Sequence, residues 1–337
     1  SMFTEWQQDK ASFSTTIGVR YTRVDMDAGL AGSNMVMMNP AIASLVDDFN
    51  AAERSKSYNM LDIAASTRYH ASDNVDVVLG VSQKNRAPTY FERYTWLPLG
   101  ISGGMADGFN YIGNLALDNE TARQIDVGID YRFKSWLVSP RLFYQDIEDY
   151  ITGSPSTNMA ANMVSTMMAG TTPFQWTNTD AVIKGADLTV SGNVFDNVKL
   201  NAVASVQHGN RDDIDDALFR IAPEQLITTI QWDTQLLDTP MALQLTSELA
   251  GAQNNVSALQ SENTTAGYGL VHITGLFTLI DNAQSNLQVT ATVHNLFDKH
   301  YAPHTAGINR VMNTAVAVGE RVPAAGREWH LSLSYRF

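Results

Sequence analysis

The last nine residues, "WHLSLSYRF", alternate between apolar and polar side chains without interruption. Successive side chains of a β-strand point to opposite faces, so this run predicts a strand with one apolar and one polar face. The stretches "FSTTIGVRYT", "IDVGIDYRF" and "LQVTATVH" follow the same period of two. Similar runs start near Leu61, Val75, Val138, Val182, Val198, Leu226, Met241 and Val271. Together they predict about twelve strands of roughly ten residues, the length of a tilted membrane-crossing strand.

The connections between these runs alternate between long and short. A long stretch follows the first run, "ASDN" follows the second, a stretch from about Lys84 to Glu120 follows the third, and "KS" follows the fourth. In an antiparallel up-and-down sheet, successive connections lie at opposite ends. All long loops are therefore expected at one end, as in bacterial outer-membrane barrels, whose periplasmic turns are short.

The period of two by itself fits both a soluble barrel with an apolar interior and a membrane barrel with an apolar exterior. Closure with the apolar residues outside removes every strand edge and suits lipid, whereas a soluble sheet of this many strands usually splits into layers. We therefore predict an all-β fold, a transmembrane antiparallel up-and-down β-barrel over residues 1–337. An even set of twelve strands would allow the first strand to close against the last.

In such a barrel the charged residues of the strands face the lumen, because charges on the lipid face are destabilising. The residues expected there are Arg20, Arg68, Asp126, Asp130, Arg132, Arg141 and Lys199. They could pair with one another, with water or with a plug.

Two long connections are predicted to contain short helices. "NPAIASLVDDF" offers Asn39 as N-cap and Pro40 at the first helical position. The apolar face of this helix would hold Ile42, Leu45, Val46 and Phe49. "NMAANMVSTMMAG" would place Met159, Met163 and Met167 on one side of a second helix.

Composition excludes several functions. A net charge of −13 argues against nucleic-acid binding, which needs basic residues to neutralise phosphates. The chain has no cysteine, so it has neither disulfides nor a cysteine-based zinc site. It contains no G-x-S-x-G or H-E-x-x-H motif and no phosphate-binding glycine loop, so we expect no enzyme activity and no firmly bound cofactor.

Two regions resemble a known family. "NLFDKHYAPHTAGINRV", followed by "VGERVPAAGREWHLSLSYRF", resembles the end of a TonB-dependent outer-membrane receptor. "NRAPTYFERYTWLPLG", followed by "GNLALDNETARQIDVGIDYRF", is similar to the middle of the barrel in the same receptors. Within the family, the copper-type receptors are similar in "ERYTWLPL", "YIGNL", "MVSTMMAG", "RDDIDDALFRIAP", "TAGYGLV" and "AGINRV".

The resemblance implies that the chain is the C-terminal portion of a plugged barrel of roughly 22 strands. The plug domain would be absent from residues 1–337, and the natural protein would extend upstream of Ser1, signal peptide included. The implied function is TonB-dependent uptake of a scarce ligand, copper, across the bacterial outer membrane. The implied partners are outer-membrane lipid, the TonB complex acting through the missing plug, and a transported metal or metal chelate.

Methionines gather in two of the expected external loops. They are Met35, Met37 and Met38 in the first and Met159, Met163, Met167 and Met168 in the second. Thioethers are soft ligands that suit Cu(I), so these residues are candidate metal ligands, and His304 could join them. The alternative is that they pack the loop helices over the barrel mouth as adaptable fillers.

The acidic run "RDDIDD" also lies in an expected external loop. Its carboxylates, Asp212, Asp213, Asp215 and Asp216, could attract cations or bind calcium. The run lacks the glycine and the terminal glutamate of a calcium loop, which favours an ordinary solvated acidic loop.

Three other functions stay open. A receptor of the same family could carry a siderophore or haem, a barrel of about twelve strands could act as a passive porin, and a soluble secreted β-protein would show the same period of two.

Overall fold

The computed structural model of the chain describes residues 1–99, 107–236, 239–282, 284–309 and 312–337. Within these ranges fourteen strands form one sheet, and three helices lie in its loops. The strands are β1 (Met2–Lys10), β2 (Phe13–Met26), β3 (Lys56–Ser72), β4 (Val75–Arg86), β5 (Tyr111–Ile112), β6 (Glu120–Phe133), β7 (Trp136–Pro155), β8 (Phe174–Phe195), β9 (Val198–Arg211), β10 (Gln225–Leu236), β11 (Thr239–Ala250), β12 (Tyr268–Asp281), β13 (Asn286–His294) and β14 (Glu328–Arg336). The helices are α1 (Pro40–Ala51), α2 (Tyr90–Tyr94) and α3 (Met159–Ala169).

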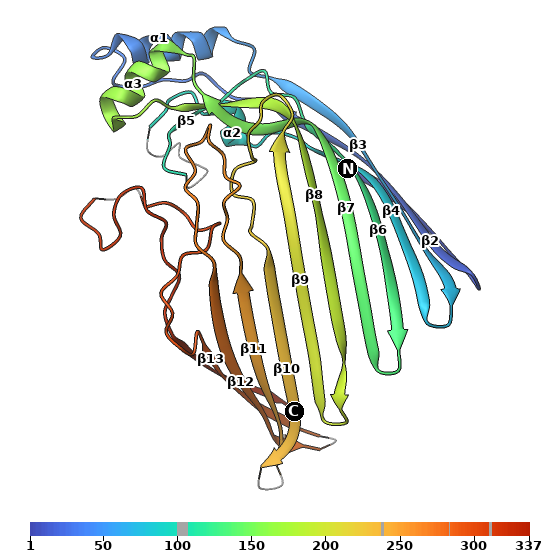
Figure 1. Cartoon of the computed structure of the whole chain (residues 1–337). Helices are drawn as coiled ribbons and strands as arrows, with labels where there is room; N and C mark the ends of the chain where they lie inside the picture. The colour runs from blue at the N-terminus through green and yellow to red at the C-terminus, as the bar shows by residue number, and fades with distance from the viewer. Residues whose placement is uncertain (100–106, 237–238, 283, 310–311) are drawn as a thin grey trace.

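The strands follow one another across the sheet in chain order. Each neighbouring pair from β1 to β14 is antiparallel, except that β5 leaves this path and pairs in parallel with β8. The connections at 11–12, 73–74, 134–135 and 196–197 are tight and lie at one end of the sheet, while the long loops lie at the other. Figure 1 shows this asymmetry, which confirms the expected alternation of loops.

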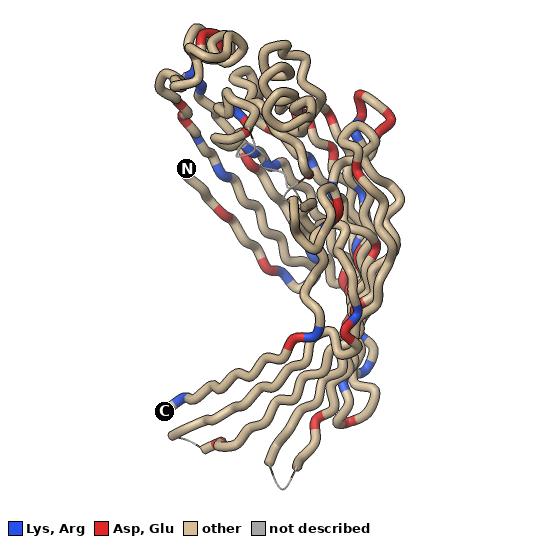
Figure 2. Tube along the Cα trace, turned by 90° about the vertical axis from the view of Figure 1, so that its left-hand side faces the viewer, with Lys and Arg blue, Asp and Glu red and all other residues tan. Residues whose placement is uncertain are grey.

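The sheet has more strands than the twelve expected. The alternation rule missed β1, which pairs with β2 from Met2↔Tyr21 to Lys10↔Phe13, and it missed the two-residue β5. Without β5, the path from β1 to β14 has an odd number of strands, so β1 and β14 run in the same direction and cannot close in antiparallel fashion. Figure 2 shows the result, an open bent wall with the N-terminal strand at one edge and the C-terminal strand at the other.

The two faces of the sheet differ as the sequence predicts. One face carries large apolar side chains that are exposed, for example Val127 (43%) and Leu142 (61%). The opposite face carries charged and polar side chains, and the long loops fold against it. This arrangement contradicts the soluble-barrel alternative, in which the apolar set would be buried, and it fits contact with lipid.

Charged side chains on the polar face pair across neighbouring strands. Asp76 accepts from Arg68 at 3.0 Å and from Arg132 at 2.8 Å, while Asp130 forms ion pairs with Arg68 and Arg141. Both carboxylates are buried, with 4% and 5% of their surface exposed. Farther along the wall are the ion pairs Arg20–Asp62 and Lys199–Asp233 and a hydrogen bond from Gln124 to Asp126. Six of the seven expected wall charges are therefore in ion pairs, Arg20, Arg132 and Lys199 with acids that were not singled out, whereas Asp126 has an amide partner in its place.

Both expected loop helices are present. The Asn39 side chain accepts from the backbone N–H groups of Ala41 and Ile42, and Pro40 begins α1 as predicted. The Asn158 side chain caps α3, and Gly170 ends it in the left-handed conformation. Among the described helices, none is long and apolar enough to cross a membrane.

The apolar face gives a first prediction. Arginine in place of Val127, near the middle of β6, should reduce the free energy of folding into a lipid bilayer by about 2–4 kcal/mol, because the charge would meet acyl chains. The matched control is Ser82→Arg on the polar face of the neighbouring β4, where a reduction below about 1 kcal/mol is expected. Denaturant titration of the chain in phosphatidylcholine vesicles measures both. Equal losses would refute the assignment of the faces.

Candidate functional site: the loop roof

The long loops form a layer over the polar face at one end of the sheet. We call this layer the loop roof, made of the described parts of residues 27–55, 87–119, 156–173, 212–224, 251–267 and 295–327. Tyr58 of β3 donates its hydroxyl to the carbonyl oxygen of Leu117 at 2.9 Å, and the Arg93 guanidinium lies over the Tyr58 ring. Leu218 packs between Ile147 and Ala181. The roof is thus attached to the wall by apolar and polar contacts.

Helices α1 and α3 form the outermost part of the roof and lie side by side (Figure 1). Their shared core contains Ile42 and Leu45 of α1, Ala161 and Val164 of α3, and Ile112 of β5. Ile42, Ala161 and Val164 are at most 1% exposed. The four residues predicted for the apolar face of α1 are all buried, so this face holds the two methionine-containing loops together.

The methionines of these two loops lie on the opposite, solvent-facing side. Met35 is half-buried against the shared core of α1 and α3. The other six are exposed, namely Met37 (97%), Met38 (79%), Met159 (80%), Met163 (59%), Met167 (64%) and Met168 (48%). The filler interpretation therefore describes Met35, whereas the other thioethers are accessible to a ligand from outside.

His304 lies in a different part of the roof. Its side chain is 1% exposed, with Nδ1 3.0 Å from the Thr265 hydroxyl and Nε2 2.9 Å from Oε1 of Glu262. Glu262 also accepts from the backbone N–H groups of Arg220 and Ser257, both at 3.0 Å. Glu262 is fully buried and joins the three loops that connect β9 to β10, β11 to β12 and β13 to β14.

A second buried acid strengthens the same junction. Asp216 accepts from the Ser257 hydroxyl at 2.6 Å and from the backbone N–H groups of Ala258 and Leu259. Arg321 lies 3.5 Å from Glu262, and burial lowers its pKa. We call Asp216, Glu262, His304 and Arg321 the acidic junction. Glu262 was not singled out in the sequence, because its partners are distant in the chain and no motif surrounds it.

The acidic run does not form a calcium site. Asp216 is used in the acidic junction, and Asp213 pairs with Arg211 at 2.6 Å, which lowers the pKa of Asp213 to about 2. Asp212 and Asp215 are exposed. Among the residues described, no three His, Asp or Glu side chains are already placed to hold a metal ion.

The surroundings of Glu262 set its protonation. Burial alone would raise the pKa of Glu262, but the contact with His304 and the backbone N–H groups of Ser257 and Arg220 outweigh burial and leave the pKa below its ordinary value. The carboxylate therefore stays ionised at neutral pH and can act as the common acceptor of the junction.

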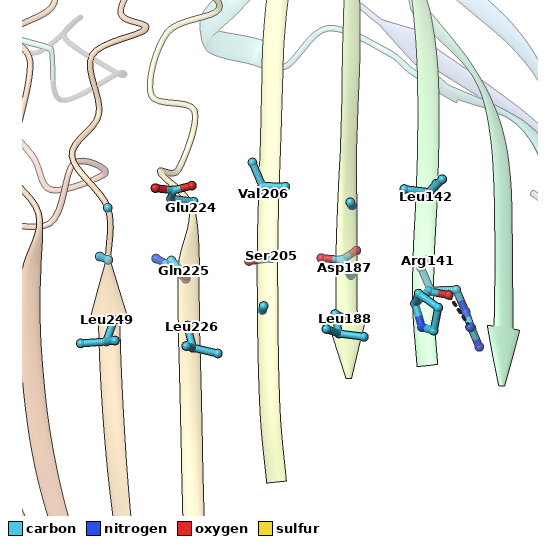
Figure 3. Close-up of a pocket in the computed structure, with 15 residues that line it drawn as sticks. Arg141, Leu142, Asp187, Leu188, Ser205, Val206, Glu224, Gln225, Leu226 and Leu249 are labelled. Atoms are coloured by element: carbon cyan, nitrogen blue, oxygen red, sulfur yellow. Dashed lines mark hydrogen bonds between the residues drawn. The ribbon is translucent and has the colours of Figure 1, made fainter. Parts of the chain in front are cut away.

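An apolar hollow lies on the exposed apolar face of the described sheet. Figure 3 shows it crossing β7 to β11, with Leu142, Leu188, Leu226 and Leu249 in its lining. These leucines belong to the exposed apolar face, so the hollow is a surface for acyl chains rather than a ligand site.

Part of the family-like sequence can be located and part cannot. "ERYTWLPL" contains the end of α2 with the buried Arg93, and "RDDIDDALFRIAP" contains Asp216 and Leu218. Arg310 and Val311 of "AGINRV", and Gly100 after "TWLPL", lie outside the described residues.

Comparison with known proteins identifies the type of barrel. The family described as "TonB dependent receptor-like, beta-barrel" matches residues 2–296. The ferric enterobactin receptor PirA of Pseudomonas aeruginosa is 23% identical over 279 residues, which cover 77% of this chain and 34% of that receptor. The chain thus spans about a third of the length of this relative.

Solved structures share the fold. The copper transporter OprC has a TM-score of 0.75 and 20% identity, covering 98% of this chain and 46% of OprC. The FrpB iron transporter from Neisseria meningitidis has a TM-score of 0.65 and 14% identity, covering 98% of this chain and 44% of FrpB. The chain spans less than half of each, and both likenesses concern the fold.

The acidic junction gives a second prediction. Glu262→Gln removes the charge that compensates Arg321 while keeping the size of the side chain. Breaking a buried ion pair on one side costs about 3–5 kcal/mol, so the three loops should open more easily by about that amount. Hydrogen–deuterium exchange of residues 212–224, 251–267 and 295–327 measures the change. Glu320→Gln, at an exposed acid of the same roof, is the control and should leave exchange unchanged.

The lowered pKa of Glu262 gives a third prediction. A carboxylate with a lowered pKa in the folded state stabilises that state above its ordinary pKa, and the contribution disappears as pH falls through the lowered value. Protection of the three loops should therefore be full at pH 7 and decrease below about pH 4.5, near the ordinary pKa of glutamate. Hydrogen exchange corrected for intrinsic rates checks this. An equally large pH effect in Glu262→Gln would assign it to another group.

Proposed function

The chain belongs to the TonB dependent receptor-like, beta-barrel family, and from this premise we propose that it is the wall and capture-loop part of a copper transporter. Members of this family are outer-membrane β-barrel proteins, and the chain is therefore a protein of the Gram-negative outer membrane. Its matched relatives are receptors and transporters rather than enzymes.

The observation that carries the proposal is the set of six exposed methionines on the roof. A group of exposed large apolar side chains marks an interaction surface, whereas a single exposed one is ordinary. Thioether sulfur is a soft donor that suits Cu(I) and is a poor ligand for Mg²⁺, Ca²⁺ or Mn²⁺. α1 and α3 hold the two methionine loops together through an apolar core, which supports a copper site shared by both loops.

The likeness to OprC, which is named a copper transporter, supports the same ligand. PirA and FrpB are named for ferric enterobactin and for iron, so a receptor for an iron chelate is the competing function within the family. A passive porin fits less well, because roof residues such as Leu218 and Arg93 pack onto the polar face of the wall.

The proposed division of labour follows from what the chain contains. Residues 1–337 would form one barrel domain, whose loops capture the ion and whose wall surrounds its passage. A plug domain, outside this chain, would connect the barrel to the TonB complex and to the energy for transport. Copper is the cargo in this scheme and is not a resident cofactor. We call the six exposed methionines the methionine surface. His304 is proposed to hold the acidic junction in place, in a different part of the roof, and to be a secondary ligand only if the junction opens.

The fourth prediction tests the methionine surface. Replacing Met37, Met163 and Met167 together by alanine should weaken Cu(I) binding by the detergent-solubilised chain at least about tenfold. Each substitution removes one soft thioether donor. Competition with a chromogenic Cu(I) chelator measures the affinity. Met312→Ala is the matched control, since Met312 is 76% exposed but lies in the loop after β13, away from α1 and α3.

In the whole receptor, the same triple substitution should reduce copper uptake by cells and leave uptake of ferric enterobactin unchanged. Wild-type Cu(I) affinity in the triple variant would contradict the copper proposal. If the triple variant lost ferric enterobactin uptake and kept copper uptake, the iron-chelate function would be favoured.

A further inference from the structure

Three histidines form a row across the last three strands of the sheet. His272 of β12, His294 of β13 and His330 of β14 have successive ring centroids 5.2 Å and 5.1 Å apart, with the rings nearly edge to face. We call this row the histidine ladder. All three lie on the polar face, because the hydroxyls of Thr274 and Thr292 meet at 3.1 Å on the same face, two residues along β12 and β13.

The ladder lies at the long-loop end of the wall. His294 is the last residue of β13, and Asn295 begins the loop that carries His304. His330 is near the start of β14, after the same loop returns. The ladder is therefore directly beneath the roof, on the surface that a captured ion would meet next.

The hydrogen bonds leave imidazole nitrogens available. Nδ1 of His272 accepts the backbone N–H of Asn295 at 3.1 Å, so Nδ1 carries no proton, the ring proton is on Nε2, and His272 supports the row without being a ligand itself. This Nε2 lies 3.7 Å from Oε2 of Glu248. In the described part of the chain, no hydrogen bond or ion pair engages the rings of His294 or His330, and both residues are exposed.

We propose that the histidine ladder binds a divalent transition-metal ion of the borderline class, with His294 as the central ligand. Neutral imidazole is the common protein ligand for Cu(II), Ni(II) and Zn(II). With metal–nitrogen bonds of about 2.0–2.1 Å and a near-tetrahedral angle, two ligating rings have centroids about 5 Å apart. The ladder has this separation twice, between His294 and each of its neighbours.

Carboxylates are available to complete the coordination. Glu248 adjoins His272, and Glu328 is the register partner of His294 on the same face. The site is open in this conformation, since no three such side chains of the described residues yet converge on one point. Rotation of the exposed His294 and His330 rings would bring two imidazoles to one ion, with a third ligand from the Glu248 or Glu328 carboxylate.

The ladder differs from the methionine surface in the ion that it favours. Thioethers suit Cu(I), whereas imidazoles and carboxylates suit divalent ions, among which Cu(II) binds most tightly at a given site. The ladder stands on its own residues and does not depend on copper being the transported ligand.

The experiment uses the full chain, without a histidine tag, in detergent at pH 7.5, with Cu(II) as the probe. Isothermal titration and electron paramagnetic resonance should reveal one site with nitrogen hyperfine coupling from at least two imidazoles. His294→Ala should weaken this site at least about tenfold and reduce the nitrogen coupling. His208→Ala is the matched control, because His208 of β9 lies away from the ladder, and it should leave the site unchanged.

The outcomes separate the two proposals. Unchanged Cu(II) affinity in His294→Ala, or a spectrum of oxygen ligands alone, would overturn the ladder site. The methionine triple variant should keep the Cu(II) site while losing Cu(I) affinity. The methionine proposal and the ladder proposal can therefore fail independently of each other. Circular dichroism of His294→Ala confirms that the strands are intact.

Discussion

The structure depends on the period of two in its strands. Each strand of the path sends apolar side chains to one face and polar side chains to the other, and neighbouring strands are in register, so the faces are continuous across the whole sheet. Between the two edges, backbone hydrogen bonds are satisfied by neighbouring strands, as lipid requires. Everything else follows from having one face for acyl chains and one for water, ions and loops.

On the polar face, each buried carboxylate contacts several positively charged or N–H groups. Asp76 and Asp130 each serve two arginines near the short turns, and Glu262 serves several donors beneath the roof. A buried carboxylate is tolerated when several donors surround it. The same arrangement fixes distant segments of the chain relative to one another, so loops that have no common secondary structure still form one layer.

The sequence predicted what depends on local pattern. Twelve strands, both loop helices, the alternation of loops and the pairing of the wall charges were all visible in residue spacing. β1 was missed because "MFTEWQQDK" puts apolar side chains on both faces, with Met2 and Trp6 on one and Phe3 on the other. Glu262 and the histidine ladder could not be found, because they depend on loop packing and on the register between strands. The exposure of the methionines likewise required knowing which face of α3 packs against α1.

The direction of the two edge strands restricts how this wall can become a tube. β1 and β14 run in the same direction. One added strand between them could pair with both in antiparallel fashion, but two added strands could not. Any set of strands that completes the barrel with antiparallel neighbours must therefore be odd in number, and the sum with this wall is even. Bacterial outer-membrane barrels have even numbers of strands. In this wall, the shared direction of β1 and β14 is enough to require an even total.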